Sequence, residues 1–302
     1  MEKQFLQKTK RPSVVVRIMG GLGNQLFCYA AARRLAHINN AELILDVYTG
    51  YTKDITYKRE YLLHQFAISA REEKSVSLYE RIRRAINKRI SNLRLCCNEV
   101  YVKEKSPYEI DERILNLRVN RSVYLTGYWQ SPRYFEDIND IIRKEFQIVA
   151  PISQEWMREA EMIRQIPESI AVGIRRYVEV KQIGAHQVIH LDYYVHAAEF
   201  MLRHFPKASF FIFTDDNNWV KANLHLPSSL TFIQPAKGNS DAYQKFWLMT
   251  QCRHFIISNS SFDWWAAWLA AQNGKMVVAP NRGFSNKDMI PNNWLKIDAR
   301  TA

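Results

Sequence analysis

The 302-residue sequence contains no long apolar run. No window approaches the ~20 apolar residues needed to span a bilayer, so we expect no transmembrane helix. Residues 1–11 form a basic and polar lead-in, and no apolar stretch long enough for a signal peptide follows them. No segment is long, polar and poor in aromatic residues, which excludes extended disorder and favours a folded globular protein.

Cysteines are few: Cys28, Cys96, Cys97 and Cys252. Two of them are adjacent, which is a poor geometry for a mutual disulfide. No Cys-x-x-Cys or Cys/His spacing indicates zinc, so we predict no metal site. This cysteine usage favours a reduced, cytosolic compartment.

Acidic residues are also in short supply, with 30 Asp and Glu against 42 Lys and Arg and a net charge of +12. Such a charge fits three kinds of partner: nucleic acid, an anionic membrane surface or an anionic substrate. The sequence carries no zinc-finger spacing, aromatic RNA-binding motif or clear helix-turn-helix. We therefore place nucleic acid last.

The order of predicted elements indicates an α/β protein. A β-branched strand over residues 13–19 leads through a glycine-rich turn into a helix over 26–38 and a strand over 42–46. A polar helix over 153–165, flanked by prolines, marks the boundary between two predicted domains, residues 12–150 and 168–302. Shorter elements of the first half are a strand at 123–126 and a helix at 135–146.

The second half repeats a cleaner alternation of strands and helices, which implies a parallel sheet covered on both faces. The predicted strands cover residues 169–174, 209–214, 230–233, 254–258 and 276–279. The predicted helices cover residues 192–205, 217–224, 242–250 and 262–272.

A basic amphipathic helix is predicted over residues 71–94. Its apolar residues recur at helical spacing, and most of its arginines and lysines lie off that stripe. A surface helix packed on the core is the preferred interpretation, and a contact with a membrane surface is the alternative.

Unusual polar residues follow several strands of the second half. Because ligands bind beyond the carboxyl ends of parallel strands, we expect these residues to converge on one rim. Arginine forks match phosphate oxygens, and a serine-rich helix start offers hydroxyl and N–H groups to an anion. The aspartates could accept hydrogen bonds from a guanine edge or a ribose. The candidates are Arg175, Arg176, Asp215, Asp216, Asn259, Ser260 and Ser261.

Each of these signals has a structural alternative. The arginines could form a surface salt-bridge pair, and Asp215 and Asp216 or the serines could simply cap helices. The tryptophans at 264, 265 and 268 are more typical of core packing than of a sugar platform. The glycine turn resembles a dinucleotide-binding loop, but Leu26 stands where the last glycine would be. The residues alone thus predict an α/β enzyme that handles a nucleotide or another phosphate ligand.

Taken together, the motifs resemble the bacterial α-1,2-fucosyltransferases of glycosyltransferase family 11. The resemblance runs from Gly20 to about Pro280, and its blocks are GGLGNQLF at 20–27, GYWQS at 127–131, FTDD at 213–216 and SNSSFxWW at 258–265. It implies a GT-B-like fold with two Rossmann-like lobes facing a cleft, the first for the acceptor and the second for GDP-fucose. The implied reaction inverts the anomeric carbon and joins fucose to O2 of a galactoside, with no metal or other cofactor.

The resemblance also assigns site residues. In the first lobe they are the glycine-turn residues Gly21, Gly23, Asn24 and Gln25. In the second lobe the family carries a His-x-Arg-Arg-x-Asp block, which here reads GIRRYV at 173–178, with both arginines kept and the histidine and aspartate absent. Arg175, with Arg176, is expected to stabilise the departing diphosphate. Glu179 and His186 are the candidate general bases.

Two alternatives follow from the altered block. The chain could use a different nucleotide sugar, or it could be a degenerate member that binds a glycan without catalysis. The expected acceptor is a galactose-containing glycan of a surface polysaccharide or oligosaccharide. A lipid-linked glycan is one form that this acceptor could take. The net charge of +12 fits cytoplasmic placement with peripheral contact at the anionic inner face of the membrane.

Overall fold

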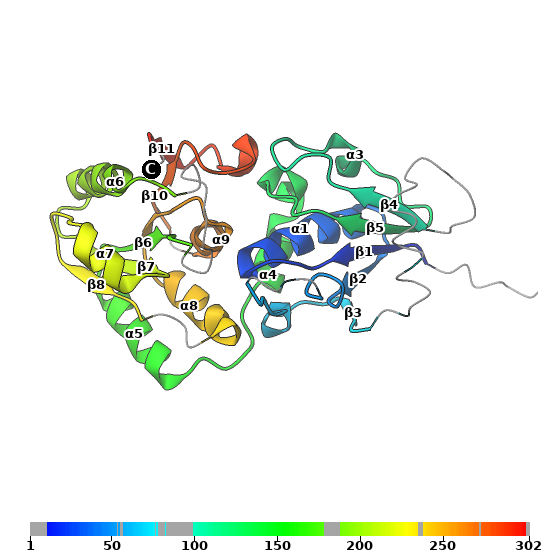
Figure 1. Cartoon of the computed structure of the whole chain (residues 1–302), viewed down its shortest axis with the longest axis horizontal. Helices are drawn as coiled ribbons and strands as arrows, with labels where there is room; N and C mark the ends of the chain where they lie inside the picture. The colour runs from blue at the N-terminus through cyan, green and yellow to red at the C-terminus, as the bar shows by residue number, and fades with distance from the viewer. Residues whose placement is uncertain are drawn as a thin grey trace, which may run out of the picture.

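The structure is a computed structural model of the whole chain (Figure 1). It describes residues 11–52, 54, 57–75, 77, 82, 99–177, 188–234, 238–271 and 273–299. The candidate bases Glu179 and His186 and most of the predicted helix over 71–94 lie outside these residues.

Among the described residues, five parallel strands form the first sheet, in the order β3-β2-β1-β5-β4. The central strand β1 is a run of buried valines, as expected for a parallel strand covered on both faces. The strands are β1 (Ser13–Arg17), β2 (Glu42–Asp46), β3 (Arg71–Glu73), β4 (Glu99–Lys103) and β5 (Ser122–Thr126). The helices of this half are α1 (Leu22–Ile38), η1 (Leu63–Gln65), α3 (Glu112–Leu115), η2 (Pro132–Tyr134), η3 (Glu136–Ile138) and α4 (Asn139–Glu145).

In the second half, the described residues form a sheet of six parallel strands in the order β11-β10-β9-β6-β7-β8. The strands are β6 (Ser169–Ile174), β7 (Ser209–Thr214), β8 (Leu230–Phe232), β9 (His254–Ile256), β10 (Val277–Pro280) and β11 (Leu295–Ile297). The helices are α5 (Gln154–Gln165), α6 (Leu191–His204), α7 (Asn217–Asn223), η5 (Asn239–Asp241), α8 (Ala242–Met249), α9 (Ser261–Leu269) and η6 (Lys287–Met289).

Both sheets reverse their strand order beside their first strand. In the first sheet, β2 and β5 lie on opposite sides of β1, and in the second, β7 and β9 lie on opposite sides of β6. Such a switch point opens a crevice at the carboxyl ends of the two neighbouring strands. The topology therefore marks one candidate site on each sheet.

The two halves meet through α1 and α9, which lie side by side in the middle of the molecule (Figure 1). Phe27 of α1 lies 4.8 Å from the ring of Trp264 and 4.9 Å from that of Trp265, measured between centroids. All three side chains are fully buried in one core cluster that draws residues from both sheets. The prediction that these tryptophans pack in the core is confirmed.

The α/β prediction is confirmed, and most predicted elements of the second half agree with the structure within one or two residues. The helix predicted from residue 26 begins a turn earlier, at Leu22. The helix predicted from residue 71 is wrong over Arg71–Glu73, because these residues form the edge strand β3 and pair in parallel with β2. No helix within the described ranges is both long and apolar enough to cross a membrane.

Candidate functional site

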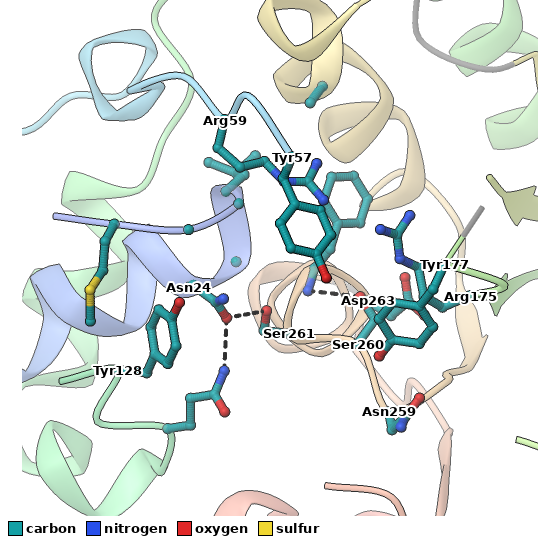
Figure 2. A pocket seen from close by; sticks show the side chains of 18 of the residues that line it. Asn24, Tyr57, Arg59, Tyr128, Arg175, Tyr177, Asn259, Ser260, Ser261 and Asp263 are labelled. Atoms are coloured by element: carbon teal, nitrogen blue, oxygen red, sulfur yellow. Dashed lines mark hydrogen bonds between the residues drawn. The ribbon is translucent and has the colours of Figure 1, made fainter. Parts of the chain in front are cut away.

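A cavity of about 1270 Å³ lies where the two switch points face each other (Figure 2). From the first sheet it receives the turn after β1 and the segment after β5, and from the second the segments after β6, β7 and β9. Its lining includes Gly21, Gly23, Asn24, Tyr128, Gln130, Arg175, Asp215, Asn259, Ser260, Ser261 and Asp263. Eight residues predicted from the sequence thus lie along one cavity: Gly21, Gly23, Asn24, Arg175, Asp215, Asn259, Ser260 and Ser261.

Asp215, at the end of β7, holds the arginine block in place. Its carboxylate accepts a hydrogen bond from Nη1 of Arg175 at 2.8 Å. It also accepts from the backbone N–H groups of Arg176 and Tyr177, at 2.7 and 2.8 Å. Tyr177 has a positive φ of 57°, and these bonds stabilise that turn. Asp215 therefore orients Arg175, a residue that lines the cavity.

Arg176 and Asp216 do not belong to the lining that the described residues form. The guanidinium of Arg176 stacks 3.5 Å above the ring of Trp219. Asp216 caps α7, because its Oδ1 accepts from the backbone N–H of Trp219 at 3.0 Å. Of the two arginines of the block, the structure thus brings Arg175 to the cavity and leaves Arg176 outside its described lining.

Two charged residues that sequence reasoning missed lie in the same part of the cavity. Lys245 of α8 donates from Nζ to the carbonyl of Thr214 at 2.7 Å, and burial lowers its pKa to about 8. Asp263 of α9 accepts a hydrogen bond from the Oγ of Ser258 at 2.6 Å. Burial raises the pKa of Asp263 to about 6, although hydrogen bonds from Ser258 and the positive charges of Arg175 and Lys245 act to lower it. Each is the sole charged residue of an otherwise apolar helix, and that pattern is the signal that could have identified them.

The glycine turn makes a close contact between the two halves. A Cβ at Gly23 would lie 2.4 Å from the carbonyl carbon of Ser261, so only glycine fits there. Beside it, Oδ1 of Asn24 accepts from Ser261 Oγ at 2.7 Å and from Gln130 Nε2 at 2.8 Å (Figure 2). Gly20 has a positive φ of 77°, which favours glycine at the start of this turn.

The remaining polar groups near the turn and the helix start are bonded within the protein. Ser260 Oγ accepts from the N–H of Phe262 at 3.2 Å and caps α9, as the alternative interpretation of the serines predicted. Asn259 donates from Nδ2 to the carbonyl of Gly283 at 3.1 Å. Gln25 is fully buried and bonds the backbone of Gly20, Glu60 and Leu62, outside the described lining.

The wall contributed by the first half is rich in tyrosine. Tyr57, Tyr108 and Tyr128 line it together with Arg17, Asp54, Arg59 and Gln130. In Figure 2, Tyr57, Arg59 and Tyr128 stand on one side, and Arg175, Tyr177 and Asp263 on the other. The cavity therefore has a tyrosine-rich wall that also carries charged residues, and a facing wall whose charged residues are fixed by hydrogen bonds.

Residues 13–298 match the model of Glycosyl transferase family 11. An Alpha-1,2-colitosyltransferase of Escherichia coli is 30% identical over 94% of this chain and 99% of its own. A Galactoside alpha-(1,2)-fucosyltransferase 1 of Bos taurus is 31% identical over 48% of this chain and 43% of its own. Among solved structures, Arabidopsis thaliana FUT1 in complex with GDP superposes with a TM-score of 0.52 and 10% identity, covering 89% of this chain and 70% of that one.

The structural neighbour shows the shared fold, and the GT-B-like arrangement of two parallel-sheet lobes is confirmed. The match to the family runs from the first strand to the last, through the cavity and both switch points. The chain therefore belongs to glycosyltransferase family 11.

Proposed function

We propose that this protein transfers L-fucose from GDP-fucose to the 2-hydroxyl of a galactoside, with inversion at the anomeric carbon. The observation that carries the proposal is the position of Arg175, which Asp215 holds at the switch point beside the first turn of α9. The bovine relative, a galactoside α-1,2-fucosyltransferase by name, supports the sugar and the linkage. The plant structural neighbour binds GDP and supports a guanine nucleotide as the carrier.

Negative charge builds on the diphosphate as the sugar leaves it. Arg175 offers a fixed fork of donors to that charge. The N-terminus of α9 adds backbone N–H groups and a favourable dipole. Because the Oγ atoms of Ser260 and Ser261 are engaged within the protein, we assign the anion contacts to the guanidinium and the backbone. No metal is needed in this scheme.

The acceptor would lie against the tyrosine-rich wall. Tyr57, Tyr108 and Tyr128 offer aromatic surface with a polar tip, which suits the mixed apolar and hydroxylated faces of a galactoside. A general base must take the proton of the attacking hydroxyl, and Glu179 and His186 stay the candidates from the sequence. We further propose a lipid-linked glycan as the acceptor, reached at the cytoplasmic face of an anionic membrane that the +12 charge would attract.

Colitose is the second candidate for the transferred sugar. The relative that covers nearly the whole chain is an Alpha-1,2-colitosyltransferase. Colitose is fucose without its 3-hydroxyl. A site that hydrogen-bonds this hydroxyl would reject the deoxy sugar by roughly 10⁴–10⁵ in kcat/KM, whereas a site without such a contact would accept both.

A donor screen tests the proposal. The purified protein is given a galactose-terminated acceptor with GDP-fucose, GDP-colitose, GDP-mannose or UDP-galactose, and nucleotide release and product linkage are measured. We expect GDP release and an α-1,2-linked product with GDP-fucose. The ratio of kcat/KM for GDP-fucose to that for GDP-colitose decides which of the two sugars is the natural one. A product formed with UDP-galactose but with none of the GDP-sugars would contradict a GDP-sugar donor. Donor binding without any glycoside product would support the non-catalytic alternative.

A further inference from the structure

Gly173 leaves a space that the carboxyl group of Asp263 fills. A Cβ built on Gly173 would lie 2.2 Å from Oδ2 and 2.4 Å from Cγ of Asp263. Gly173 is a buried residue of β6 with ordinary strand pairing, so space rather than backbone conformation requires glycine there. The position is the one where the sequence departs from the family's histidine, and here an acid from α9 occupies it.

One carboxylate oxygen of Asp263, Oδ2, is held by hydrogen bonds, and the other, Oδ1, is not, among the residues that the structure describes. The side chain is 6% exposed. Its Oδ2 accepts from the backbone N–H and the Oγ of Ser258, at 3.2 and 2.6 Å. Within the described part of the chain, Oδ1 has no hydrogen-bond partner, and the residue lines the cavity.

Charged groups surround Asp263, but within the described ranges none forms an ion pair with it. Arg175 is bonded to Asp215, and Lys245 donates to a backbone carbonyl. Tyr177, Tyr193 and Tyr194 also face this carboxyl group, and burial raises the pKa of all three, so they stay neutral. Burial raises the pKa of Asp263 to about 6, so it is ionised for the most part at pH 7 while the cavity is empty.

We propose that Asp263 couples donor binding to the uptake of one proton: with the nucleotide sugar bound, the side chain is neutral and donates a hydrogen bond from Oδ1 into the cavity. The inference rests on the proposed GDP-sugar donor. A diphosphate beside Arg175 brings negative charge close to a buried carboxylate, and a like charge favours the protonated acid. The proton comes from solvent on binding and returns to it when the nucleotide leaves.

A purely structural role predicts no proton uptake on donor binding. An acid in the first turn of a helix stabilises the helix dipole, and this requires the ionised form. In that role Asp263 would bind no proton with the ligand. The pH dependence of donor binding therefore separates the two roles.

The experiment measures the Kd of GDP-fucose, or of GDP-colitose if the screen selects it, without acceptor. The donor is a diphosphate diester that does not titrate between about pH 5 and pH 8, so the pH dependence belongs to the protein. We expect the Kd of the wild type to rise about tenfold per pH unit above pH ~6.5, up to the pKa of the complex. The Kd of Asp263→Asn should rise only a few-fold by pH 8, as the nearby Lys245, with a pKa of about 8, loses its proton. At pH 8 the variant should bind about 50-fold more tightly than the wild type, an effect that misfolding cannot produce.

Asp192→Asn is the matched control, because Asp192 is an acid in the first turn of α6 with a side chain 57% exposed. It should keep the wild-type slope. Calorimetry of the wild type at pH 7, in buffers of different ionisation enthalpy, counts the protons without any variant, and we expect close to one per donor. Zero protons, or an Asp263→Asn variant that binds more weakly with an unchanged slope, would overturn the inference. A wild type that binds no GDP-sugar at pH 6 would instead overturn the proposed function.

Discussion

The two walls of the cavity are built differently. On the second half, Asp263 is buried and Arg175 and Lys245 are half-buried. Each is fixed by a hydrogen bond to a neighbouring strand end or loop. On the first half, three tyrosines and two amides line the cavity together with Arg17, Asp54 and Arg59. A wall of fixed charges can stabilise an anion without reorganising, whereas an aromatic wall suits a neutral sugar. We propose that the charged wall is the donor side and the tyrosine-rich wall the acceptor side, and variants on each side can test this proposal.

Removal of the Arg175 guanidinium should have the largest effect. We expect Arg175→Ala to lower kcat/KM by about 10²–10³, because a preorganised donor to the leaving group is lost. Initial rates of GDP release with a saturating acceptor measure it. The control is Arg176→Ala, since Arg176 is the adjacent guanidinium and stacks on Trp219. The control should lose less than about tenfold. Equal losses in both variants would contradict the proposal that Arg175, and not Arg176, stabilises the departing diphosphate.

The close contact between α1 and α9 at Gly23 should be sensitive to added side-chain volume. Gly23→Ala places a methyl group 2.4 Å from the Ser261 backbone, and we expect the free energy of unfolding to fall by about 3 kcal/mol. The matched control is Gly21→Ala in the same turn. Its Cβ would have no neighbour closer than 3.8 Å, and its φ of −72° suits alanine. The control should change stability by less than about 1 kcal/mol, as urea unfolding would measure. Similar losses in both variants would mean that α1 and α9 do not pack as closely as described.

A double-mutant cycle sharpens the comparison within the charged wall. Gly173→Ala should destabilise the protein because its methyl group meets the Asp263 carboxylate. In an Asp263→Ala background that clash is absent. We expect the two substitutions to be coupled by about 1–3 kcal/mol in urea unfolding. Additive effects would show that Gly173 is required for a reason other than the space that Asp263 occupies.

The sequence predicted the strands and helices that carry a strong apolar pattern. The predicted bounds of β2, β6 and β7 agree with the structure to the residue, because buried parallel strands appear as continuous apolar runs. We did not predict β3, β4 and β11, which are sheet-edge strands of mixed or polar composition. Such strands are defined by pairing, which a sequence pattern does not show.

For the site, the sequence identified the segments but not every side chain. Successive residues after a strand point in different directions, so Arg175 reaches the cavity while Arg176 stacks on Trp219. Lys245 and Asp263 were missed because only the packing of α8 and α9 on the sheet buries their charges at the cavity. The tyrosine-rich wall was missed for a similar reason, since its members come from distant segments of the first half.

A crystal structure of the protein with GDP tests the central claim most directly. We predict that the diphosphate lies between the guanidinium of Arg175 and the first turn of α9, with a phosphate oxygen within about 3.2 Å of Nη1 or Nη2 of Arg175. A diphosphate bound against the tyrosine-rich wall, or outside the cavity between the two sheets, would contradict it.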